Sequence, residues 1–249
     1  MRWRNFREVL RQLPDLGGKI VDTARIYGSS EEVIGSIVES LGNRDKLFLA
    51  TKTPMNGDLS DIAGAVDLAF TRMKVKKLDL IQVHNFYGTD QFVAEFRKRK
   101  DAGQVRYMGV STSTDNQYDQ LADAMRKYPL DFIQVDYSID NRSAADNILP
   151  LAQERGIAVL VNMPFGGRRN AASTFSKVAK RELPDWAGEI DATSWAQVFL
   201  KYCVSHPSVT AAIPGTTKPH HLLDNQGGAR GRLPDAAMRK EIEKYWDSL

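Results

Sequence analysis

Apolar segments of strand length alternate with helical apolar periodicity along nearly the whole chain of 249 residues. Seven strands are predicted, over residues 19–22, 46–52, 78–84, 105–111, 131–138, 157–165 and 209–215. Their near-continuous apolar runs are typical of a parallel sheet that helices cover. Each run is followed by a segment in which apolar residues recur with the period of a helix. The pattern therefore predicts seven units, each a strand followed by a helix.

The helix predicted after the first strand has the clearest boundaries. Its apolar face consists of Val33, Ile34, Ile37, Val38 and Leu41. Ser29 and Glu32 have the spacing of a capping box, and Gly42 suits a C-terminal cap. A further helix is predicted before the first strand, around residues 6–13, and others at 62–73, 92–103, 121–125, 148–151, 194–204, near 222 and 236–246. No change in composition marks a linker, so residues 1–249 are expected to form one domain.

Regular alternation of this kind is compatible with a closed barrel or with an open, doubly wound sheet. Almost every predicted strand ends in a polar residue or glycine, and in a barrel these ends converge on one mouth. An open dinucleotide-binding sheet should instead carry G-x-G-x-x-G after an early strand, and this motif is missing from the sequence. We therefore predict an α/β barrel of the TIM (β/α)8 type that is one strand short.

The charge balance gives no indication of a nucleic-acid partner. Thirty-four basic and 31 acidic residues leave a formal charge of +3, and the basic run at residues 96–100 is expected to form the solvated face of a helix. A membrane span is not expected, because no apolar stretch approaches about 20 residues. The N-terminus lacks the apolar region of a secretory signal, so the chain as given is expected in the cytoplasm. Cys203, the one cysteine, excludes an intramolecular disulfide and is predicted to be buried.

Three chemically capable side chains end consecutive strands: Asp22, Lys52 and His84, with Tyr27 one short loop beyond Asp22. Neighbouring parallel strands lie about 4.8 Å apart, so these side chains are expected to meet. Lys52 beside the Tyr27 hydroxyl would lower the pKa of the phenol, and Asp22 would hold Lys52 charged. His84 would orient a carbonyl oxygen. Each residue alone fits an ordinary structural role, but the four together favour a site that protonates an oxygen while another group delivers an electron pair to carbon.

Several segments carry a resemblance to a known family. They are VDTARIYGSSEEVIG, LATK, LDLIQVH, GQVRYMGVST, FIQVDYSIDNR, GIAVLVNMPFGG and IPGTTKPHHLLDN. In this order they resemble the signature segments of the aldo-keto reductases, over roughly residues 6 to 245. The resemblance implies an NAD(P)H-dependent enzyme on a (β/α)8 barrel that reduces an aldehyde or ketone. It makes Tyr27 the proton donor, Lys52 and Asp22 its tuning pair, and His84 the orienting residue.

The resemblance also implies a cofactor site. Its residues would be Ser111, Gln134, Asn162, Phe165, Gly166, Gly215, Thr216, Thr217, Lys218, His221 and Asn225. NADPH is the expected cofactor, with NADH as the alternative, and no metal is expected. Two positions depart from the family. Asn162 stands where a tyrosine usually stacks on the nicotinamide, and His221 replaces the arginine that reads the 2′-phosphate, which weakens discrimination because a neutral histidine lacks fixed charge.

The family's first strand has no counterpart in the sequence. We favour a start inside a longer gene as the explanation; the alternatives are a barrel that closes imperfectly and a gap that another chain or segment fills. Similar bacterial proteins carry a twin-arginine export signal, so a longer precursor would make the periplasm the alternative location. Two other functions remain open: a catalytically weak nicotinamide-binding regulatory protein, and an inactive truncated remnant. Substrate specificity is expected to depend on the loops at residues 54–60, 85–90 and 168–191. The sequence specifies no oligomeric state.

Overall fold

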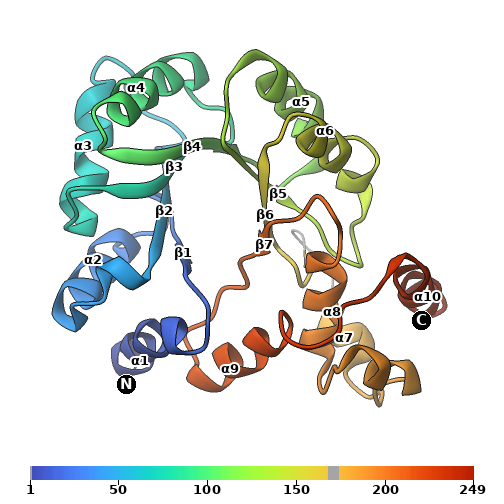
Figure 1. The fold of residues 1–249 in the computed structure, drawn as a ribbon. Helices are drawn as coiled ribbons and strands as arrows, with labels where there is room; N and C mark the ends of the chain where they lie inside the picture. Colours follow the sequence, from blue (N-terminus) through green and yellow to red (C-terminus); the bar gives the residue numbers. More distant parts are fainter. Residues whose placement is uncertain (1, 168–173) are drawn as a thin grey trace.

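Seven parallel strands form one curled sheet with helices on its outside (Figure 1). The structure is a computed structural model that describes residues 2–167 and 174–249. The strands are β1 (Ile20–Asp22), β2 (Phe48–Lys52), β3 (Leu78–His84), β4 (Val105–Ser111), β5 (Phe132–Asp136), β6 (Ala158–Asn162) and β7 (Ala211–Ala212). Each pairs in parallel with the next strand of the chain. All seven predicted strands are confirmed, although β7 is only two residues long.

The helices follow the predicted alternation. They are α1 (Arg2–Asp15), α2 (Ser30–Leu41), α3 (Ile62–Met73), α4 (Thr89–Asp101), α5 (Tyr118–Lys127), α6 (Ile148–Glu154), α7 (Thr174–Val178), α8 (Trp195–Val204), α9 (Pro219–Gly227) and α10 (Ala236–Asp247). Short 3-10 turns cover Arg44–Lys46, Asp115–Gln117, Ser143–Ala145 and Asp185–Ile190. The sequence pattern did not predict α7, which lies in a polar stretch. The other helices were predicted, with differences at their ends.

The two caps predicted for α2 have different outcomes. Gly42 adopts the left-handed conformation (φ 61°), and its N–H closes the helix on Val38 and Glu39, as predicted. The capping box at Ser29 is wrong, because the Ser29 side chain makes no capping hydrogen bond. Its backbone (φ −87°, ψ 14°) is not in the extended conformation that an N-cap side chain needs to reach back to the first turn.

The sheet has two apolar faces with different neighbours. Its outer face packs against the helices in one large core. Its inner face holds a smaller core of Ala50, Leu80 and Leu160. Below these, the rings of Phe48, Tyr107 and Phe132 pack together with centroids 5.3–6.0 Å apart. Alternate residues of each strand therefore fill the interior of the barrel, as the pleat requires.

The strand layer is open between β1 and β7. Among the described residues, β1 pairs only with β2, and β7 pairs only with β6. The helical layer nevertheless closes over this gap, because α1 packs against α9 (Figure 1). The Arg230 guanidinium also donates to the carbonyl of Leu16 at 2.6 Å. The predicted barrel that is one strand short is confirmed.

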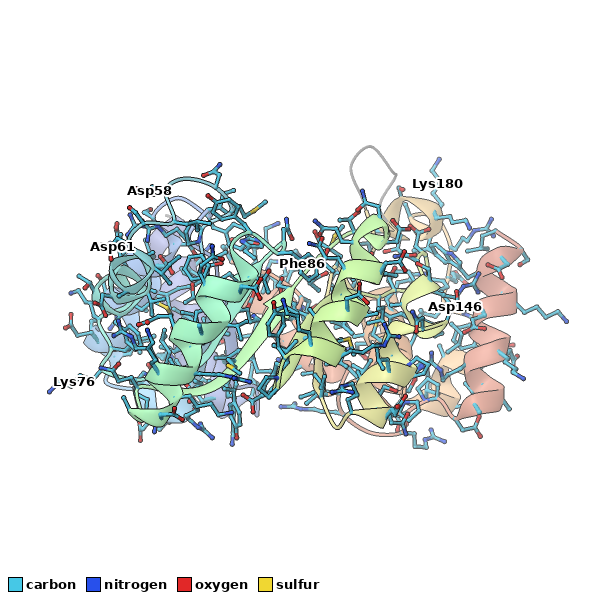
Figure 2. The ribbon with its side chains drawn as sticks, turned by 90° about the horizontal axis from the view of Figure 1, so that it is seen from above. Asp58, Asp61, Lys76, Phe86, Asp146 and Lys180 are labelled. Atoms are coloured by element: carbon cyan, nitrogen blue, oxygen red, sulfur yellow. The ribbon has the colours of Figure 1, made fainter. Side chains whose placement is uncertain are left out.

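The carboxyl ends of the strands meet at one end of the molecule. In Figure 2, Asp58, which follows β2, lies at the upper end together with Lys180, which follows β6. Lys76 precedes β3 and lies at the lower end. The polar strand ends that the sequence analysis singled out therefore share the upper end, the mouth of the barrel.

Features away from the mouth agree with the sequence analysis. Cys203 is fully buried in α8. In the basic run on α4, Phe96 is buried while Arg99 pairs with Glu95 and Asp67, and Lys100 pairs with Asp131 at the surface. No helix in the described ranges has both the length and the apolar character needed to cross a membrane.

Candidate functional site

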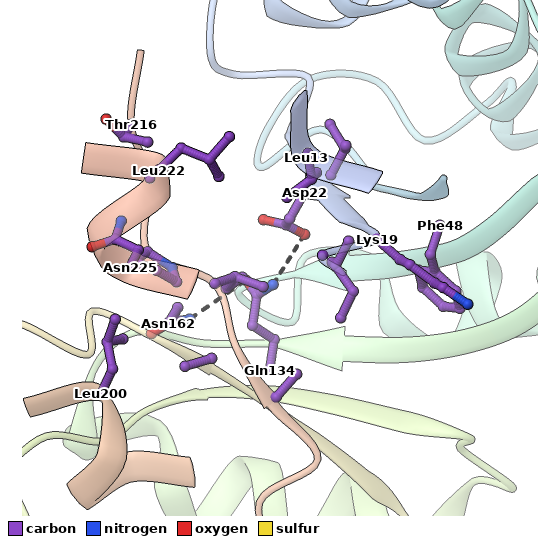
Figure 3. Close-up of a pocket in the computed structure, with 18 of the residues that line it drawn as sticks. Leu13, Lys19, Asp22, Phe48, Gln134, Asn162, Leu200, Thr216, Leu222 and Asn225 are labelled. Atoms are coloured by element: carbon purple, nitrogen blue, oxygen red, sulfur yellow. Dashed lines mark hydrogen bonds between the residues drawn. The ribbon is translucent and has the colours of Figure 1, made fainter. Parts of the chain in front are cut away.

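A cavity of about 1300 Å³ connects the mouth of the barrel with the gap between β1 and β7. The predicted site residues on its wall are Asp22, Tyr27, His84, Ser111, Gln134, Asn162, Gly215, Thr216, Thr217 and Asn225. Figure 3 shows Asp22, Gln134 and Asn162 close to one another, with Asn225 and Leu222 of α9 on the facing wall. The fold thus brings residues that lie up to more than 200 positions apart in the sequence together around one cavity.

Asp22 and Lys52 form an ion pair at the ends of β1 and β2. The Lys52 Nζ donates to Asp22 Oδ2 at 2.5 Å and to the carbonyl of Thr23 at 2.9 Å. Only 1% of the Lys52 side chain and 11% of the Asp22 side chain are exposed. Burial raises the pKa of Asp22, while the Lys52 charge and hydrogen bonds act in the opposite direction. Lys52 lies behind Asp22 and does not itself line the cavity.

Tyr27 stands over this ion pair on the loop between β1 and α2. The Lys52 Nζ lies 5.7 Å from the centroid of the Tyr27 ring, and the ring meets His84 edge-on at 6.3 Å. The Tyr27 N–H donates to the Ala24 carbonyl at 3.0 Å, which tightens the turn that carries the ring. Tyr27 is 54% exposed, so its phenol is open to the cavity.

The predicted lowering of the Tyr27 pKa is wrong, because the net shift is upward. Partial burial, together with the negative charge of Asp22, raises the pKa of Tyr27 above its ordinary value. The Lys52 charge does not outweigh these two effects, because Asp22 compensates it and the ammonium lies over the ring, 5.7 Å from its centroid. Tyr27 is therefore a protonated phenol throughout the neutral pH range.

His84 ends β3 with its ring at the cavity and only 7% of its surface exposed. Its backbone N–H donates to Thr53 Oγ1 at 3.1 Å, which ties the strand end to the residue that follows Lys52. Burial, and to a smaller degree the positive charge of Lys52, lowers the pKa of His84 to about 4. The imidazole is therefore neutral near pH 7 and carries one N–H.

This lowered pKa predicts a pH dependence of stability. A histidine whose pKa is about 4 in the folded state and 6.5 when unfolded takes up protons preferentially on unfolding. The stability that neutral His84 contributes is therefore complete above pH 6.5 and is lost as the pH falls toward 4, on the order of 1–3 kcal/mol in the free energy of unfolding. Urea denaturation of the unaltered protein and of His84→Gln across this range measures it. The His84→Gln variant should show a shallower slope, and equal slopes would contradict the prediction.

A chain of hydrogen bonds joins the predicted nicotinamide residues to the ion pair. The Ser111 hydroxyl donates to Gln134 Oε1 at 3.0 Å, and Gln134 Nε2 donates to Asp22 Oδ1 at 3.0 Å (Figure 3). Asn162 Nδ2 donates to the Thr112 carbonyl at 2.9 Å and lies 3.4 Å from Gln134 Oε1. Sequence spacing did not predict this link between Asp22 and Gln134, which are 112 residues apart.

The segment before α9 forms the second half of the cavity wall. Gly215, Thr216 and Thr217 line it, and Lys218 precedes Pro219 at the first turn of the helix. The free N–H groups of a helix N-terminus and a neighbouring cation favour anions. His221 is exposed, and slight burial together with the neighbouring His220 and Lys218 lowers its pKa, so it is mostly neutral at pH 7. Lys218 and His221 do not line the cavity themselves.

Two further predicted cofactor residues, Phe165 and Gly166, are also not on the cavity wall. Phe165 packs its ring against Phe175 with centroids 5.0 Å apart. Gly166 has a left-handed backbone (φ 61°), and a Cβ there would lie 3.1 Å from the Asp140 side chain. Within the third predicted specificity loop, residues 168–173 lie outside the described residues.

The sequence analysis missed several residues of the wall. Asn85 and Met163 line it immediately after His84 and Asn162, and both have positive φ of 50°. Such conformations cost energy in residues other than glycine and concentrate at functional sites. The position of Asn85 directly after a predicted strand end was a usable signal, whereas Met163 lies inside the strand predicted over residues 157–165. The apolar side of α1 also lines the cavity through Phe6, Val9, Leu10 and Leu13. No local pattern identifies that wall, because helix periodicity predicts the same residues for an ordinary core.

Comparison with known proteins gives a consistent result. The model of the "Aldo/keto reductase family" matches residues 4–246. The chain is 27% identical over 282 residues to "Aldo-keto reductase yakc [NADP(+)]" of Schizosaccharomyces pombe, covering 96% of this chain and 82% of the relative. It is 29% identical over 253 residues to "Aldo-keto reductase YhdN" of Bacillus subtilis, covering 86% and 76%.

Solved structures show the same fold. An aldo/keto reductase from Klebsiella pneumoniae in complex with NADP and acetate matches with a TM-score of 0.78 and 21% identity, covering 98% of this chain and 86% of that one. The holo form of an aldo-keto reductase from Bacillus halodurans matches with a TM-score of 0.78 and 23% identity, covering 96% and 86%. Among the residues that the structure describes, no cluster of three or more His, Cys, Asp or Glu side chains is arranged to hold a metal ion.

Proposed function

Since the chain belongs to the aldo/keto reductase family, we propose that it reduces a small aldehyde or ketone with NADPH. One observation supports this proposal independently of the family match. Tyr27 and His84 stand edge to edge at one cavity, with the Asp22–Lys52 ion pair directly behind them. This arrangement offers two N–H or O–H donors to one oxygen atom, which is what the reduction of a carbonyl group requires.

Tyr27 is the proton donor in this proposal. Its raised pKa keeps the phenol protonated until an alkoxide, a far stronger base than the carbonyl, develops on the substrate. The proton then passes from the Tyr27 hydroxyl to that oxygen and leaves a phenolate. Lys52, 5.7 Å from the ring centroid, stabilises the phenolate electrostatically in a buried setting. Asp22 and the Thr23 carbonyl hold the ammonium in place.

His84 orients the substrate. As a neutral imidazole it donates its single N–H to the carbonyl oxygen that Tyr27 protonates, without competing as an acid. The apolar side chains of α1 on the same wall keep the space around the reacting group poor in water, which strengthens both hydrogen bonds.

The residues around the cavity fit a nicotinamide dinucleotide. The family relative from Schizosaccharomyces pombe is named for NADP(+), and the Klebsiella structure holds NADP. The reduced nicotinamide, when bound, supplies a hydride to the carbonyl carbon. Ser111, Gln134 and Asn162 present amide and hydroxyl groups beside the catalytic residues for its carboxamide. Residues 215–218 and the start of α9 would hold its phosphates, and Asn225 its adenine.

The experiment is a cofactor titration beside a turnover assay. We expect NADPH to bind to the purified protein, measured by the fluorescence of the reduced nicotinamide, and to bind more tightly than NADH because Lys218 supplies positive charge near the predicted phosphate site. A panel of aldehydes and ketones should accelerate NADPH oxidation. Tight binding without turnover would replace this proposal with a nicotinamide-binding regulatory role. Failure to bind either nucleotide would refute both.

A further inference from the structure

A buried amide in the barrel interior has no role in the site described so far. Gln82 lies on β3 with no exposed surface, and neither its Oε1 nor its Nε2 has a hydrogen-bond partner among the described residues. Its main chain is satisfied, since the Gln82 carbonyl accepts from the Thr53 N–H at 2.9 Å. Burying an unpaired amide group costs about 1–3 kcal/mol, so such groups are usually solvated by internal water.

His84, two residues further along the strand, also has a buried polar atom without a hydrogen-bond partner. Its Nδ1 is buried and has no partner in the described part of the chain. Leu80 belongs to the inner core and His84 lines the cavity, and alternate residues of a strand face the same side. Gln82 therefore lies between them on the inner face, one step below His84.

The two residues in register with Gln82 do not pair with its amide. Gln82 is in register with Lys52 on one side and Gly109 on the other. Gly109 brings no side chain into this layer and tolerates none, because a Cβ there would lie 2.4 Å from the Phe132 carbonyl oxygen. On the other side, the positive charge of Lys52 favours the amide orientation in which Oε1 faces Lys52 and Nε2 faces away from it.

We propose that a buried water molecule links Gln82 Nε2 to His84 Nδ1 and thereby fixes the tautomer of His84. The water accepts from the Gln82 amide and donates to Nδ1, so the ring proton resides on Nε2, which faces the cavity. Gln82 is thus a positioning residue that acts through His84. This inference rests on the proposed function in one respect: only the tautomer with Nε2–H donates to a carbonyl oxygen in the cavity.

The test is the Gln82→Leu variant, read by the ring ¹⁵N shifts of histidine. Leucine suits the inner layer next to Leu80, and removing an unpaired amide should leave the free energy of unfolding unchanged or higher. In the cofactor-free unaltered protein near pH 7, we expect the His84 signals of one tautomer, with Nδ1 unprotonated and Nε2 protonated. In Gln82→Leu we expect shifts that indicate a mixture. His84→Gln assigns the signals, with His206, His220 and His221 as internal references.

The matched control is Leu80→Met, one step lower on the same face, which changes packing but no polar group. It should leave the His84 tautomer as it is. With turnover established, kcat/KM of Gln82→Leu should fall about tenfold, as for the loss of other hydrogen-bonded partners that orient a functional histidine. Identical ¹⁵N shifts in Gln82→Leu and the unaltered protein, or a proton on Nδ1 in the latter, would overturn the inference. A protein that binds no cofactor would refute the proposed function and still give this readout.

Discussion

Replacing Tyr27 by phenylalanine is expected to lower kcat/KM for carbonyl reduction by about 10²–10⁴, the usual contribution of a positioned general acid. The phenol stands both on the cavity wall and over the buried Lys52 ammonium. Removing its oxygen leaves the ring and the turn intact, because that turn is held by backbone hydrogen bonds such as Tyr27 N–H to the Ala24 carbonyl. NADPH affinity should therefore be unchanged, while turnover is lost.

The control is Tyr128→Phe, which removes a phenol hydroxyl that bonds to Asp90 at the surface of the molecule and should leave turnover unchanged. The pH profile adds a second check. Because partial burial and Asp22 raise the pKa of Tyr27, the unaltered protein should show no loss of kcat/KM from its ionisation below about pH 10. Turnover by Tyr27→Phe at the unaltered rate would disprove the assignment of Tyr27 as the acid.

The sequence predicted the convergence of Asp22, Tyr27 and His84 because a barrel has only one mouth. Strand ends recognised from apolar runs must meet there, and the pairing of Asp22 with Lys52 follows from adjacent strands. The direction of the Tyr27 pKa depends on finer geometry. Whether a lysine lies beside a hydroxyl or against a ring, already paired to a carboxylate, is not expressed in the spacing of residues.

The sequence analysis did not predict the contacts across the barrel interior, for a related reason. Gln134 reaches Asp22 only because the sheet curls, and Gln82 lies beside a position without a side chain only because Gly109 is in register with it. Both depend on register, which a pattern of apolar residues constrains only to within the alternation of the two faces. The wall formed by α1 shows the same limit, since a buried helix face and the side of a cavity have the same sequence pattern.

Replacing Lys52 by methionine is expected to reduce both stability and activity, because it leaves the Asp22 carboxylate buried without its counter-ion. Breaking a buried ion pair from one side costs about 3–5 kcal/mol in the free energy of unfolding. Burial already raises the pKa of Asp22, and without Lys52 that pKa rises further. A carboxyl group with a raised pKa in the folded state stabilises at low pH and loses this contribution as the pH rises. The loss in the free energy of unfolding of Lys52→Met relative to the unaltered protein should therefore be smaller at pH 5 than at pH 8.

A double variant separates the two roles of this ion pair. In Asp22→Asn with Lys52→Met, the amide oxygen still accepts from Gln134 Nε2 but carries no charge, so most of the lost stability should return. Turnover should stay low, because nothing then stabilises the Tyr27 phenolate. Lys98→Met is the matched control, since 76% of the Lys98 side chain is exposed and its loss should leave both properties unchanged. Urea denaturation and NADPH oxidation measure the two effects. Recovery of turnover in the double variant would show that Lys52 acts only on stability.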